Sequence, residues 1–391
     1  MQSAILWPVI SSQDIQALLA DYDQDQLTIG VLGGHSALDV CAGAKKHGFR
    51  TVAVCQEGRE KTYQKYLKRR AAENRAGAEL GCIDEVIVVP KFGDVVDSDV
   101  QERLRKMNTV FIHNRYFWVY CDFEKVEKDF RVPIFGTRTL LKKEERDQEK
   151  NQYYLLQKAG IRTPIIFERP EDIDRHVLVK VNEATRGYER AFFVVKDFDH
   201  YKEVVERGLA AGDFTEVAIK DAVIEEFIVG AHVNFNFFYS PFAGEVELMG
   251  TDMRRQTNLD GLLRMPAWDQ IQLHKKGFDV KMIETGHVAV TVKESLLEKI
   301  YDMGERFVAA TQKEHAPGII GPFALQGAVV AEEGKEDIVI FDVSMRIPGS
   351  PGTASTPYSG YLYGHPISFG ERIAMEIAEG VKQGKLAELV T

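Results

Sequence analysis

Cysteine is scarce in this chain of 391 residues, and its four copies do not form recognisable pairs. Cys41, Cys55, Cys82 and Cys121 all fall in the first third of the chain, and no two of them form a C-x-x-C motif. This spacing argues against a zinc site or a disulfide framework, and it is typical of buried cysteines in a reducing compartment. We therefore expect a cytoplasmic protein.

The sequence also lacks long apolar runs and an excess of positive charge. No apolar stretch approaches the length of a membrane span, and the first residues do not read as a charged region followed by an apolar one. Lys and Arg number 49 against 59 Asp and Glu, which gives a net charge of -10. Because phosphate backbones require clustered basic residues, we expect neither nucleic acid nor membrane as a partner. A local basic pocket for one small phosphate ester remains compatible with this total.

Two common catalytic signatures are missing as well. The first glycine-rich turn, Gly33–Gly34, is not part of a G-x-G-x-x-G motif, so a nicotinamide oxidoreductase is poorly supported. We also find no Ser/His/Asp or Cys/His arrangement for covalent catalysis. The sequence instead favours chemistry that works by positioning the reactants and neutralising charge.

The length of the chain exceeds one comfortable hydrophobic core and predicts two or three lobes. From Leu27, the stretch "LTIGVLGGHSALDVCAGAKKHGFRTVAVC" reads as strand, turn, helix and strand. Further short apolar strands are expected at residues 85–90, 109–114 and 132–137. Residues 1–140 are therefore predicted to form a doubly wound, Rossmann-like α/β domain.

The turn from Gly33 to Ser36 is a candidate phosphate site. Its glycines allow close backbone approach, and Ser36 is expected to cap the following helix, whose free N–H groups favour anions. An ordinary glycine-rich turn with a serine cap explains the same residues equally well.

Two lysines downstream could reach one triphosphate from different elements. Lys150 is predicted in the first turn of a helix within "DQEKNQYYLLQKAGIRTP", and Lys180 ends the apolar strand "VLVK". The loop "EATRGYER" suits a flap over phosphates, in which Arg186 supplies charge and Gly187 backbone freedom. The plainer interpretation is a solvated lysine at position 150 and an ordinary hairpin loop.

Two further segments carry polar groups suited to small-molecule recognition. "EEFIVG" ends a strand in paired carboxylates, which suits an adenine edge but also describes a polar strand end. "DMRRQTNLDGLLRMP" gathers Arg254, Arg255 and Arg264, which suggests a carboxylate or phosphate ester because guanidinium groups grip such anions.

A hairpin near the end of the chain is the most informative feature of the sequence. "GPFALQGAVV" (321–330) and "VIFDVS" (339–344) read as adjacent strands that place Gln326 and Asp342 on the inward face. Inward oxygens suit Mg²⁺, which keeps other positions for water and nucleotide phosphates. The alternative is a hairpin whose polar residues face solvent. The turn-rich stretch "RIPGSPGTASTPYSGYLYG" after it is expected to be a loop near the site.

Taken together, these motifs resemble an ATP-grasp ligase, and more narrowly the formate-dependent FAICAR synthetase family. The likeness runs from about Gly30 to Glu371 and includes "GHSALDVCAGAKKHGFRTVAVCQEGREKTY", "ELMGTDMRRQTNLDGLLRMPAWDQ" and "FDVSMRI". It implies an ATP-grasp domain at 141–391, with a small lobe at about 141–225 and a large lobe at about 226–391. It also implies ATP- and formate-dependent formylation of the amine of AICAR in purine synthesis, with Mg²⁺ or Mn²⁺, and we expect small-molecule substrates and a homo-oligomer.

The resemblance assigns roles to individual residues. His35 with its neighbour Ser36 and Asn258 match substrate positions, and Gln326 and Asp342 match metal positions. At the nucleotide, the matching residues are Lys150, Lys180, Glu225, Glu226, Phe227 and Ile228. To these we add, from the residues themselves, Arg186 and Gly187 as a flap over the nucleotide and Arg254 or Arg346 as cations that would assist catalysis. The implied mechanism phosphorylates a small carboxylate with ATP, and the amine of a ribotide then attacks the acyl phosphate.

The chain departs from the family pattern at several positions. Arg115 and Tyr116, in "HNRYFWVY", stand where a Gly-Ser pair is usual in a substrate-binding turn. His232 stands where many ATP-grasp enzymes use a glutamate on the ribose, and Asp342 replaces the usual glutamate at the metal. These changes leave open a paralogue that joins another small carboxylate to a related ribotide or amine, and a non-catalytic nucleotide-binding regulator is a further alternative.

Overall fold

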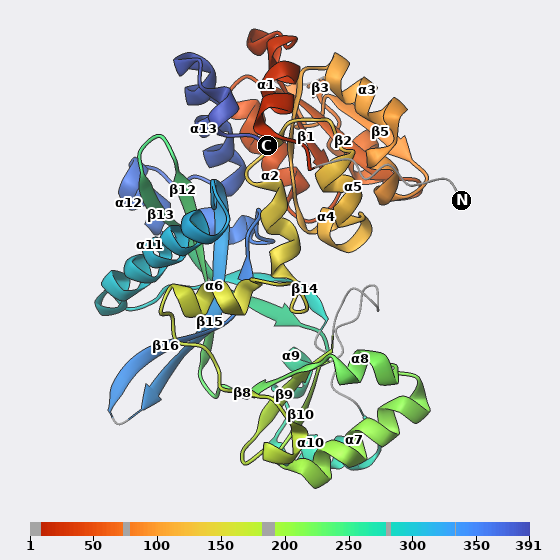
Figure 1. Ribbon diagram of the computed structural model, residues 1–391, viewed down its shortest axis with the longest axis vertical. Helices are drawn as coiled ribbons and strands as arrows, with labels where there is room; N and C mark the ends of the chain where they lie inside the picture. Colours follow the sequence, from red (N-terminus) through yellow and green to blue (C-terminus); the bar gives the residue numbers. More distant parts are fainter. Residues whose placement is uncertain (1–8, 73–78, 182–191, 279–282, 333) are drawn as a thin grey trace.

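A computed structural model describes residues 9–72, 79–181, 192–278, 283–332 and 334–391. In these residues, three larger sheets and one two-stranded sheet, made by β3 (Arg70–Ala71) and β4 (Glu79–Leu80), form the framework. The larger sheets lie along the long axis of the molecule, with the last one in chain order between the other two (Figure 1). Among the described residues, no helix has the length and apolar character needed to cross a membrane.

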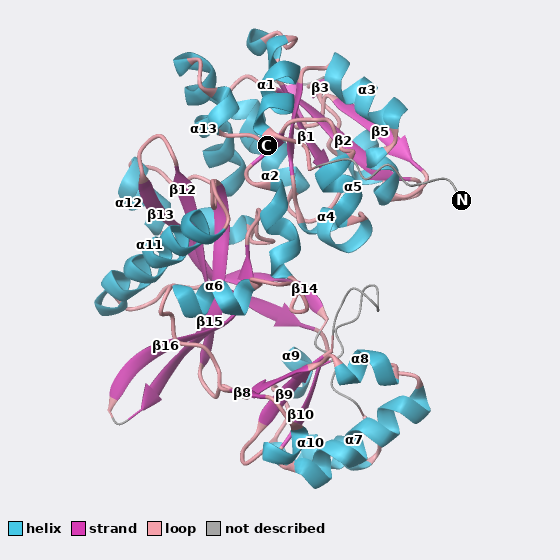
Figure 2. Ribbon diagram, in the orientation of Figure 1, coloured by secondary structure: helices cyan, strands magenta, loops and turns pink. Residues whose placement is uncertain are grey.

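The first sheet is parallel and has the strand order β5-β2-β1-β6-β7. Because the order reverses direction around β1, the turn after β1 lies where open α/β sheets bind ligands. Helices pack against this sheet (Figure 2), so the predicted doubly wound domain is confirmed. Its elements are α1 (Ser12–Ala20), β1 (Thr28–Leu32), α2 (Ala37–Lys46), β2 (Arg50–Gln56), β5 (Glu85–Val89), α3 (Ser98–Lys106), β6 (Thr109–Ile112), α4 (Arg115–Tyr120), α5 (Phe123–Lys128) and β7 (Ile134–Phe135).

The second sheet is small and antiparallel, with the order β10-β9-β11-β8. Helices α7 and α8 lie beside it at the far end of the molecule from the first sheet (Figure 1). Its core is a compact apolar cluster that includes Val177, Val179 and Ile224. The elements are β8 (Ile166–Phe167), β9 (Val177–Lys180), β10 (Phe192–Val195), α7 (Phe198–Ala211), α8 (Glu216–Lys220) and β11 (Val223–Glu226).

The third sheet is antiparallel, occupies the centre of the molecule and has the order β14-β13-β12-β15-β16. Stacked aromatic rings from this sheet and from α11 fill its core, among them Phe237, Phe307 and Phe323. Its elements are α6 (Gln152–Lys158), β12 (Ala231–Ser240), β13 (Glu245–Gln256), α9 (Leu259–Leu262), α10 (Ala267–Lys275), β14 (Glu284–Ala289), α11 (Leu297–Glu314), β15 (Gly321–Glu332) and β16 (Lys335–Ser344).

The predicted hairpin of β15 and β16 is confirmed. Gln326 and Asp342 are direct cross-strand partners, and a bulge follows between Gln326 and Gly327. The three larger sheets fall at residues 28–135, 166–226 and 231–344. The domain boundaries at 140 and 225 remain predictions that agree with this sequence of sheets.

Two local predictions were wrong. Lys150 does not lie in the first turn of a helix, because Asn151 caps α6 and accepts hydrogen bonds from the N–H groups of Tyr153 and Tyr154. The turn-rich stretch after β16 is not entirely loop, since α12 (Tyr358–Tyr363) forms within it and ends at Gly364. Buried Tyr358 and Ser359 anchor that short helix, so packing outweighs its weak helix propensity.

The end of the chain returns to the first sheet. Helix α13 (Phe369–Gln383) packs on α2, and the N–H of Gly370 donates to the Asp39 carboxylate at 3.0 Å. Thr391 then exchanges backbone hydrogen bonds with Ile134 of β7. The first sheet is therefore completed by residues from the other end of the chain.

A buried ionic network ties α13 to the central sheet. The Arg372 guanidinium lies 2.7 Å from Glu247 on β13 and 2.8 Å from Glu376, and all three side chains are nearly inaccessible. It also covers the ring of Phe238, with its central carbon 4.2 Å from the ring centre. Both carboxylates have further partners, Tyr363 and Ser240, so the network is well satisfied.

We predict that Arg372→Met lowers the free energy of unfolding by about 3–5 kcal/mol, because it leaves two buried carboxylates without their cation. Lys382→Met on the same helix removes an exposed ion pair with Glu379 and should change stability by less than about 0.5 kcal/mol. Urea midpoints followed by circular dichroism compare the two variants. Equal midpoints would contradict this account of how α13 is held.

Candidate active site

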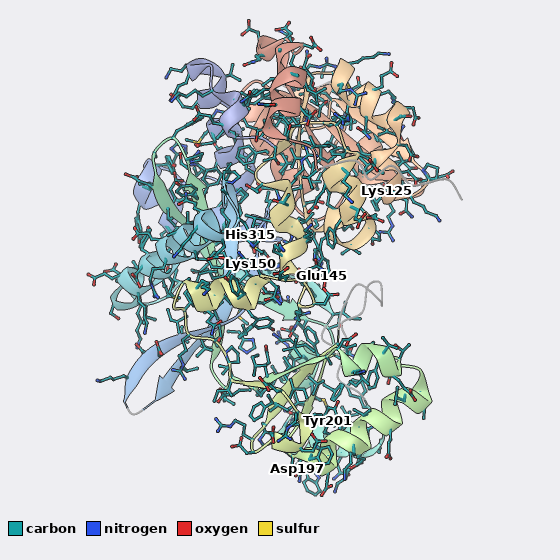
Figure 3. The ribbon with its side chains drawn as sticks, viewed as in Figure 1. Lys125, Glu145, Lys150, Asp197, Tyr201 and His315 are labelled. Atoms are coloured by element: carbon teal, nitrogen blue, oxygen red, sulfur yellow. The ribbon has the colours of Figure 1, made fainter. Side chains whose placement is uncertain are left out.

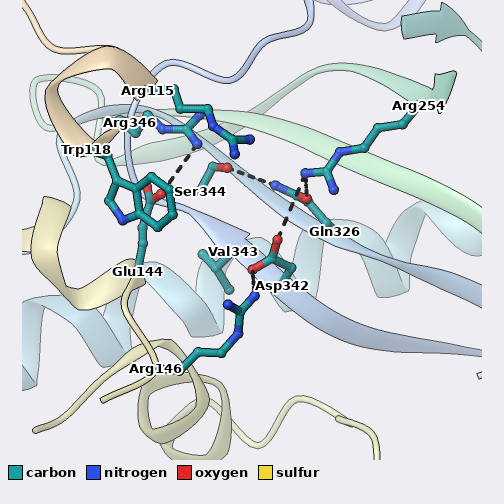
Figure 4. A pocket seen from close by; sticks show the side chains of 10 residues that line it. All are labelled: Arg115, Trp118, Glu144, Arg146, Arg254, Gln326, Asp342, Val343, Ser344 and Arg346. Carbon is teal, nitrogen blue, oxygen red and sulfur yellow. Dashed lines mark hydrogen bonds and ion pairs between the residues drawn. The ribbon is translucent and has the colours of Figure 1, made fainter. Parts of the chain in front are cut away.

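A pocket of about 350 Å³ lies beside the hairpin, between α4, the segment that precedes α6, and the central sheet (Figure 4). We call it the hairpin pocket. It is lined by Arg115, Trp118, Glu144, Arg146, Arg254, Gln326, Asp342, Val343, Ser344 and Arg346.

A second pocket of about 280 Å³ adjoins the first and shares five of its residues. We call it the loop pocket, because the segment after β16 and the turn after β1 close it. Its shared residues are Arg115, Arg254, Gln326, Ser344 and Arg346, and the added ones are His35, Asn234, Asn236, Glu284, His287, Ala324, Pro348, Gly349 and Ser350. Both arginines predicted to assist catalysis, Arg254 and Arg346, therefore line both pockets.

Gln326 and Asp342, the predicted metal pair, point into the hairpin pocket from adjacent strands (Figure 4). Arg254 donates to the Gln326 side-chain oxygen, and the Asp342 carboxylate lies 4.0 Å from Arg254 and 3.9 Å from Arg146. Among the described residues, no group of three His, Cys, Asp or Glu side chains gathers to hold a metal ion. One carboxylate and one amide oxygen fit Mg²⁺ that takes its other ligands from phosphates and water.

Glu144 fixes the position of Arg346 in the same pocket. The two charged groups lie 3.4 Å apart and are almost fully buried, and the other Glu144 oxygen accepts the backbone N–H of Met345 at 2.6 Å. Burial raises the pKa of Glu144 above its usual range, although the charge of Arg346 opposes that shift. Arg346 is thus a preorganised cation at the junction of the two pockets.

Lys180 and Glu225, both predicted at the nucleotide, form a buried ion pair with 2.5 Å between Nζ and Oε1. Lys180 also donates to the carbonyl of Phe341 on β16 at 2.9 Å. Burial opposes its charge, but Tyr153 and Glu225 outweigh that effect and hold the pKa of Lys180 above its usual range. The Tyr153 hydroxyl donates to Glu225 at 2.9 Å, a contact that the sequence analysis missed.

The rest of the "EEFIVG" segment only partly matches the expectation. The N–H groups of Glu226 and Phe227 donate to the carbonyls of Ile165 and His176, so neither is available to an adenine edge. Ile228 follows directly in the chain. His232 on β12 lies against Phe341, with ring centres 5.4 Å apart, and burial lowers its pKa.

The structure does not bring Lys150 to either pocket. Its ammonium pairs with Glu314 on α11 at 2.9 Å, and 42% of its side chain is exposed. Figure 3 shows Lys150 beside His315, whose ring contacts the Lys150 carbonyl. Arg146, four residues earlier, lines the hairpin pocket instead, with its guanidinium 5.8 Å from the ring centre of Phe192. The predicted flap residues Arg186 and Gly187 lie outside the described residues.

The turn after β1 differs from the prediction. Ser36 does not cap α2, because its backbone is left-handed with φ 71° and its hydroxyl donates to the carbonyl of Pro348 at 2.6 Å. His35 also has positive φ, and its buried Nδ1 has no hydrogen-bond partner among the described residues. Burial, helped by Arg346 and Arg115, holds the pKa of His35 well below its usual range. A neutral His35 therefore lines the loop pocket.

Arg115 and Tyr116, the two departures from the family pattern, have different surroundings. Arg115 reaches both pockets, with its guanidinium 5.5 Å from the ring centre of Trp118. Tyr116 packs on Phe92, with ring centres 4.7 Å apart, and occupies the space that a side chain at Gly34 would need. Tyr116 is thus a filler behind the turn and lines neither pocket.

The predicted arginine cluster is dispersed. Arg255 lies on β13 with about half of its side chain exposed and pairs with Asp260 at 3.7 Å. Asn258 precedes α9 with φ 61° and is absent from the lining of both pockets, as is Arg264. Neighbouring residues on a strand point to opposite faces, so Arg254 and Arg255 could not both reach one site.

A histidine held between two acids was missed by the sequence analysis. His287 on β14 contacts Asp252 through Nδ1 at 2.5 Å and Glu284 through Nε2 at 2.9 Å. Glu284 in turn lies 3.2 Å from Arg254. Burial opposes protonation, but the two carboxylates outweigh it and raise the pKa of His287 to about 9. Protonated His287 therefore bridges the carboxylates of Asp252 and Glu284, and Glu284 in turn contacts Arg254 of the hairpin pocket.

This arrangement predicts a pH-dependent contribution to stability. Because the folded-state pKa is raised, the contribution is complete below the unfolded pKa of about 6.5 and is lost as the pH rises through about 9. His287→Gln should therefore lower the free energy of unfolding by roughly 3 kcal/mol at pH 6 and by much less at pH 9.5. Urea titrations of both proteins at the two pH values measure this difference. Parallel pH profiles would contradict the charged state.

Comparison with known proteins agrees with this fold. Two family models match, one described as a domain of unknown function (DUF1297) over residues 200–391 and one as a protein of unknown function (DUF1246) over residues 29–167. A solved IMP biosynthesis protein, PurP, from Thermococcus kodakaraensis is 25% identical with a TM-score of 0.66, covering 93% of this chain and 100% of that one. An ADP complex of N5-carboxyaminoimidazole ribonucleotide synthetase, 12% identical, shares the fold with a TM-score of 0.55 over 88% of this chain and 78% of that one.

A full-length relative decides the family. The 5-formaminoimidazole-4-carboxamide-1-(beta)-D-ribofuranosyl 5'-monophosphate synthetase of Methanopyrus kandleri is 38% identical over 384 residues, which cover 98% of this chain and 100% of the relative. The resemblance seen in the sequence is therefore confirmed. The chain belongs to this family of synthetases, which are ATP-dependent ligases with the α/β ATP-grasp fold.

Proposed function

We propose that this protein formylates the amine of AICAR with formate and ATP to give FAICAR, ADP and phosphate, a late step of purine synthesis. One observation supports the proposal most strongly. Four arginines and the Gln326 and Asp342 pair line one pocket, and Lys180 contacts the same strand as Asp342 through the Phe341 carbonyl. Such a site gathers phosphate and carboxylate groups at one point, as this reaction requires.

The chemistry proceeds in two displacements. A formate oxygen attacks the γ-phosphorus of ATP, and the bond to the ADP oxygen breaks. The AICAR amine then attacks the carbonyl carbon of formyl phosphate, loses a proton, and expels inorganic phosphate. The chain supplies no nucleophile to either step, and its contribution is to orient the reactants and neutralise negative charge.

The nucleotide would lie between the small and central sheets. Lys180, held by Glu225 and by the Phe341 carbonyl, and His232 beside the Phe341 ring would form its walls. Gln326 and Asp342 would hold Mg²⁺ or Mn²⁺, which neutralises phosphate charge when bound. Arg146 takes the role predicted for Lys150, because it faces the pocket 3.9 Å from Asp342.

The acceptor would occupy the loop pocket. His35 and Arg115 line it from the first domain, and Arg254 and Arg346 line it from the central sheet and the segment after β16. Arg254 and Arg346, which line both pockets, would contact the formyl group as it passes from phosphate to amine. Asn258 has no place in this proposal, since it lies outside both pockets.

We predict that Arg146→Met lowers kcat/KM for ATP by about 10- to 150-fold, because a charged contact contributes roughly 1.5–3 kcal/mol. Lys150→Met, a matched loss of one cation four residues away, should stay within about twofold of the wild type. Steady-state ADP release at saturating formate and AICAR measures both. The reverse order of effects would restore Lys150 to the nucleotide site.

ADP release in the presence of AICAR and formate tests the function itself. The wild type should form ADP and FAICAR in equal amounts, and omission of either substrate should stop turnover. Asp342→Asn should abolish Mg²⁺-dependent turnover without unfolding the protein, because it removes the carboxylate assigned to the metal. Turnover with another small acid or another ribotide, and none with formate and AICAR, would favour the paralogue alternative.

A further inference from the structure

Asp252 is the centre of a buried hydrogen-bond network beneath the loop pocket. It lies on β13 with no exposed surface, and its carboxylate accepts from Asn236 at 2.6 Å, Asn234 at 2.8 Å and Ser350 at 2.7 Å. His287 provides a further contact at 2.5 Å. An ionised carboxylate accepts hydrogen bonds and donates none. Each neighbour must therefore present a donor to Asp252.

This requirement fixes the orientation of the amide of Asn236. Its NH₂ group faces Asp252, so its side-chain oxygen faces away from that carboxylate. Asn236 is fully buried and lines the loop pocket, and its side-chain oxygen has no hydrogen-bond partner among the described residues. A buried acceptor without a partner is rare in native proteins and calls for a donor.

The loop pocket contains hydrogen-bonding groups of both kinds. Among its lining residues, Arg115, Arg254 and Arg346 carry donors, whereas Asn236 and Glu284 carry acceptors, and the Asn236 oxygen is a buried acceptor without a partner among the described residues. A carboxamide matches such a site, because its oxygen accepts from an arginine and its N–H groups donate. An ester, or a hydrogen atom at the same ring position, has no N–H to offer the Asn236 oxygen.

We propose that Asn236, oriented by Asp252, is a specificity-determining residue that accepts an N–H of the acceptor's carboxamide. It thereby selects the carboxamide ribotide over ribotides that lack an N–H donor at that position. The inference rests on the proposed function, in which AICAR occupies the loop pocket. Asn236 acts by recognising the substrate and takes no part in bond making.

Binding measurements test the proposal separately from turnover. Asn236→Thr suits a strand and keeps a hydroxyl donor for Asp252, but it removes the amide oxygen. By calorimetry, we expect the Kd for AICAR to rise by about 10- to 100-fold. The Kd for the same ribotide with hydrogen in place of the carboxamide, and the Kd for ATP, should stay within about twofold. An equal loss for both ribotides, or no change for AICAR, would overturn the assignment.

Thr251→Val is the matched control. Thr251 is buried on the same strand as Asp252, donates to the Val290 carbonyl at 2.6 Å and lines neither pocket. It should leave the preference for the carboxamide unchanged. A shift in that preference equal to that of Asn236→Thr would show that any lost hydrogen bond in this sheet acts alike, and would overturn the proposal.

A second measurement uses only the wild type, so a folding defect in the Asn236→Thr variant cannot affect it. The methyl ester analogue of AICAR keeps the carbonyl oxygen but lacks the N–H, so the wild type should bind it at least about tenfold more weakly. Equal affinity for amide and ester would overturn the inference even if formate-dependent turnover is found. Conversely, selective binding of AICAR without turnover would leave the inference standing and refute the proposed reaction.

Discussion

The site depends on the register between β15 and β16. Gln326 and Asp342 face the same pocket because they are direct partners, and a slip of one residue would turn one of them to the opposite face. This register requires a glycine at position 327, since a side chain there would collide with the Val339 carbonyl on the neighbouring strand. The bulge between Gln326 and Gly327 separates the pair that faces the pocket from the regular pairing in the rest of the hairpin. Arg254 donates to Gln326 on β15 and lies 4.0 Å from Asp342 on β16, so its contacts with both strands follow from that alignment.

The charge inside the hairpin pocket is opposite in sign to the charge of the whole chain. The chain carries a net charge of -10, yet the hairpin pocket has four arginines against Glu144 and Asp342. Fixed cations of this kind stabilise phosphate and carboxylate groups with little reorganisation. Two of these arginines are held by acids of the pockets themselves: Glu144 of the hairpin pocket pairs with Arg346, and Glu284 of the loop pocket pairs with Arg254. Acidic side chains therefore help to position the cations of a site whose own charge is positive.

Much of this architecture could be predicted from the sequence, because strands and hairpins leave local patterns. The parallel first sheet, the paired Gln326 and Asp342, and the buried Lys180 were all visible in short stretches. The prediction that Lys150 lies in a helix failed for a local reason, since Asn151 caps α6 and leaves the lysine outside it. The prediction that Ser36 caps α2 failed because of a distant contact, since its hydroxyl bonds to Pro348, 312 residues away. His287 and Asn236 could not be found, since Asp252 joins them only in the folded sheet.

The return of the chain to β7 affects the order in which the molecule can assemble. Strands β1 to β7 leave the ribosome long before α13 and the Thr391 segment that pairs with Ile134. Until then the outer edge of β7 and the face of α2 that receives Gly370 are uncovered. The first sheet is thus completed only after the small and central sheets have been synthesised, and contacts of such long sequence separation slow folding. An uncovered strand edge can pair with another chain, so β7 stays open to such pairing from its own synthesis until Thr391 reaches Ile134.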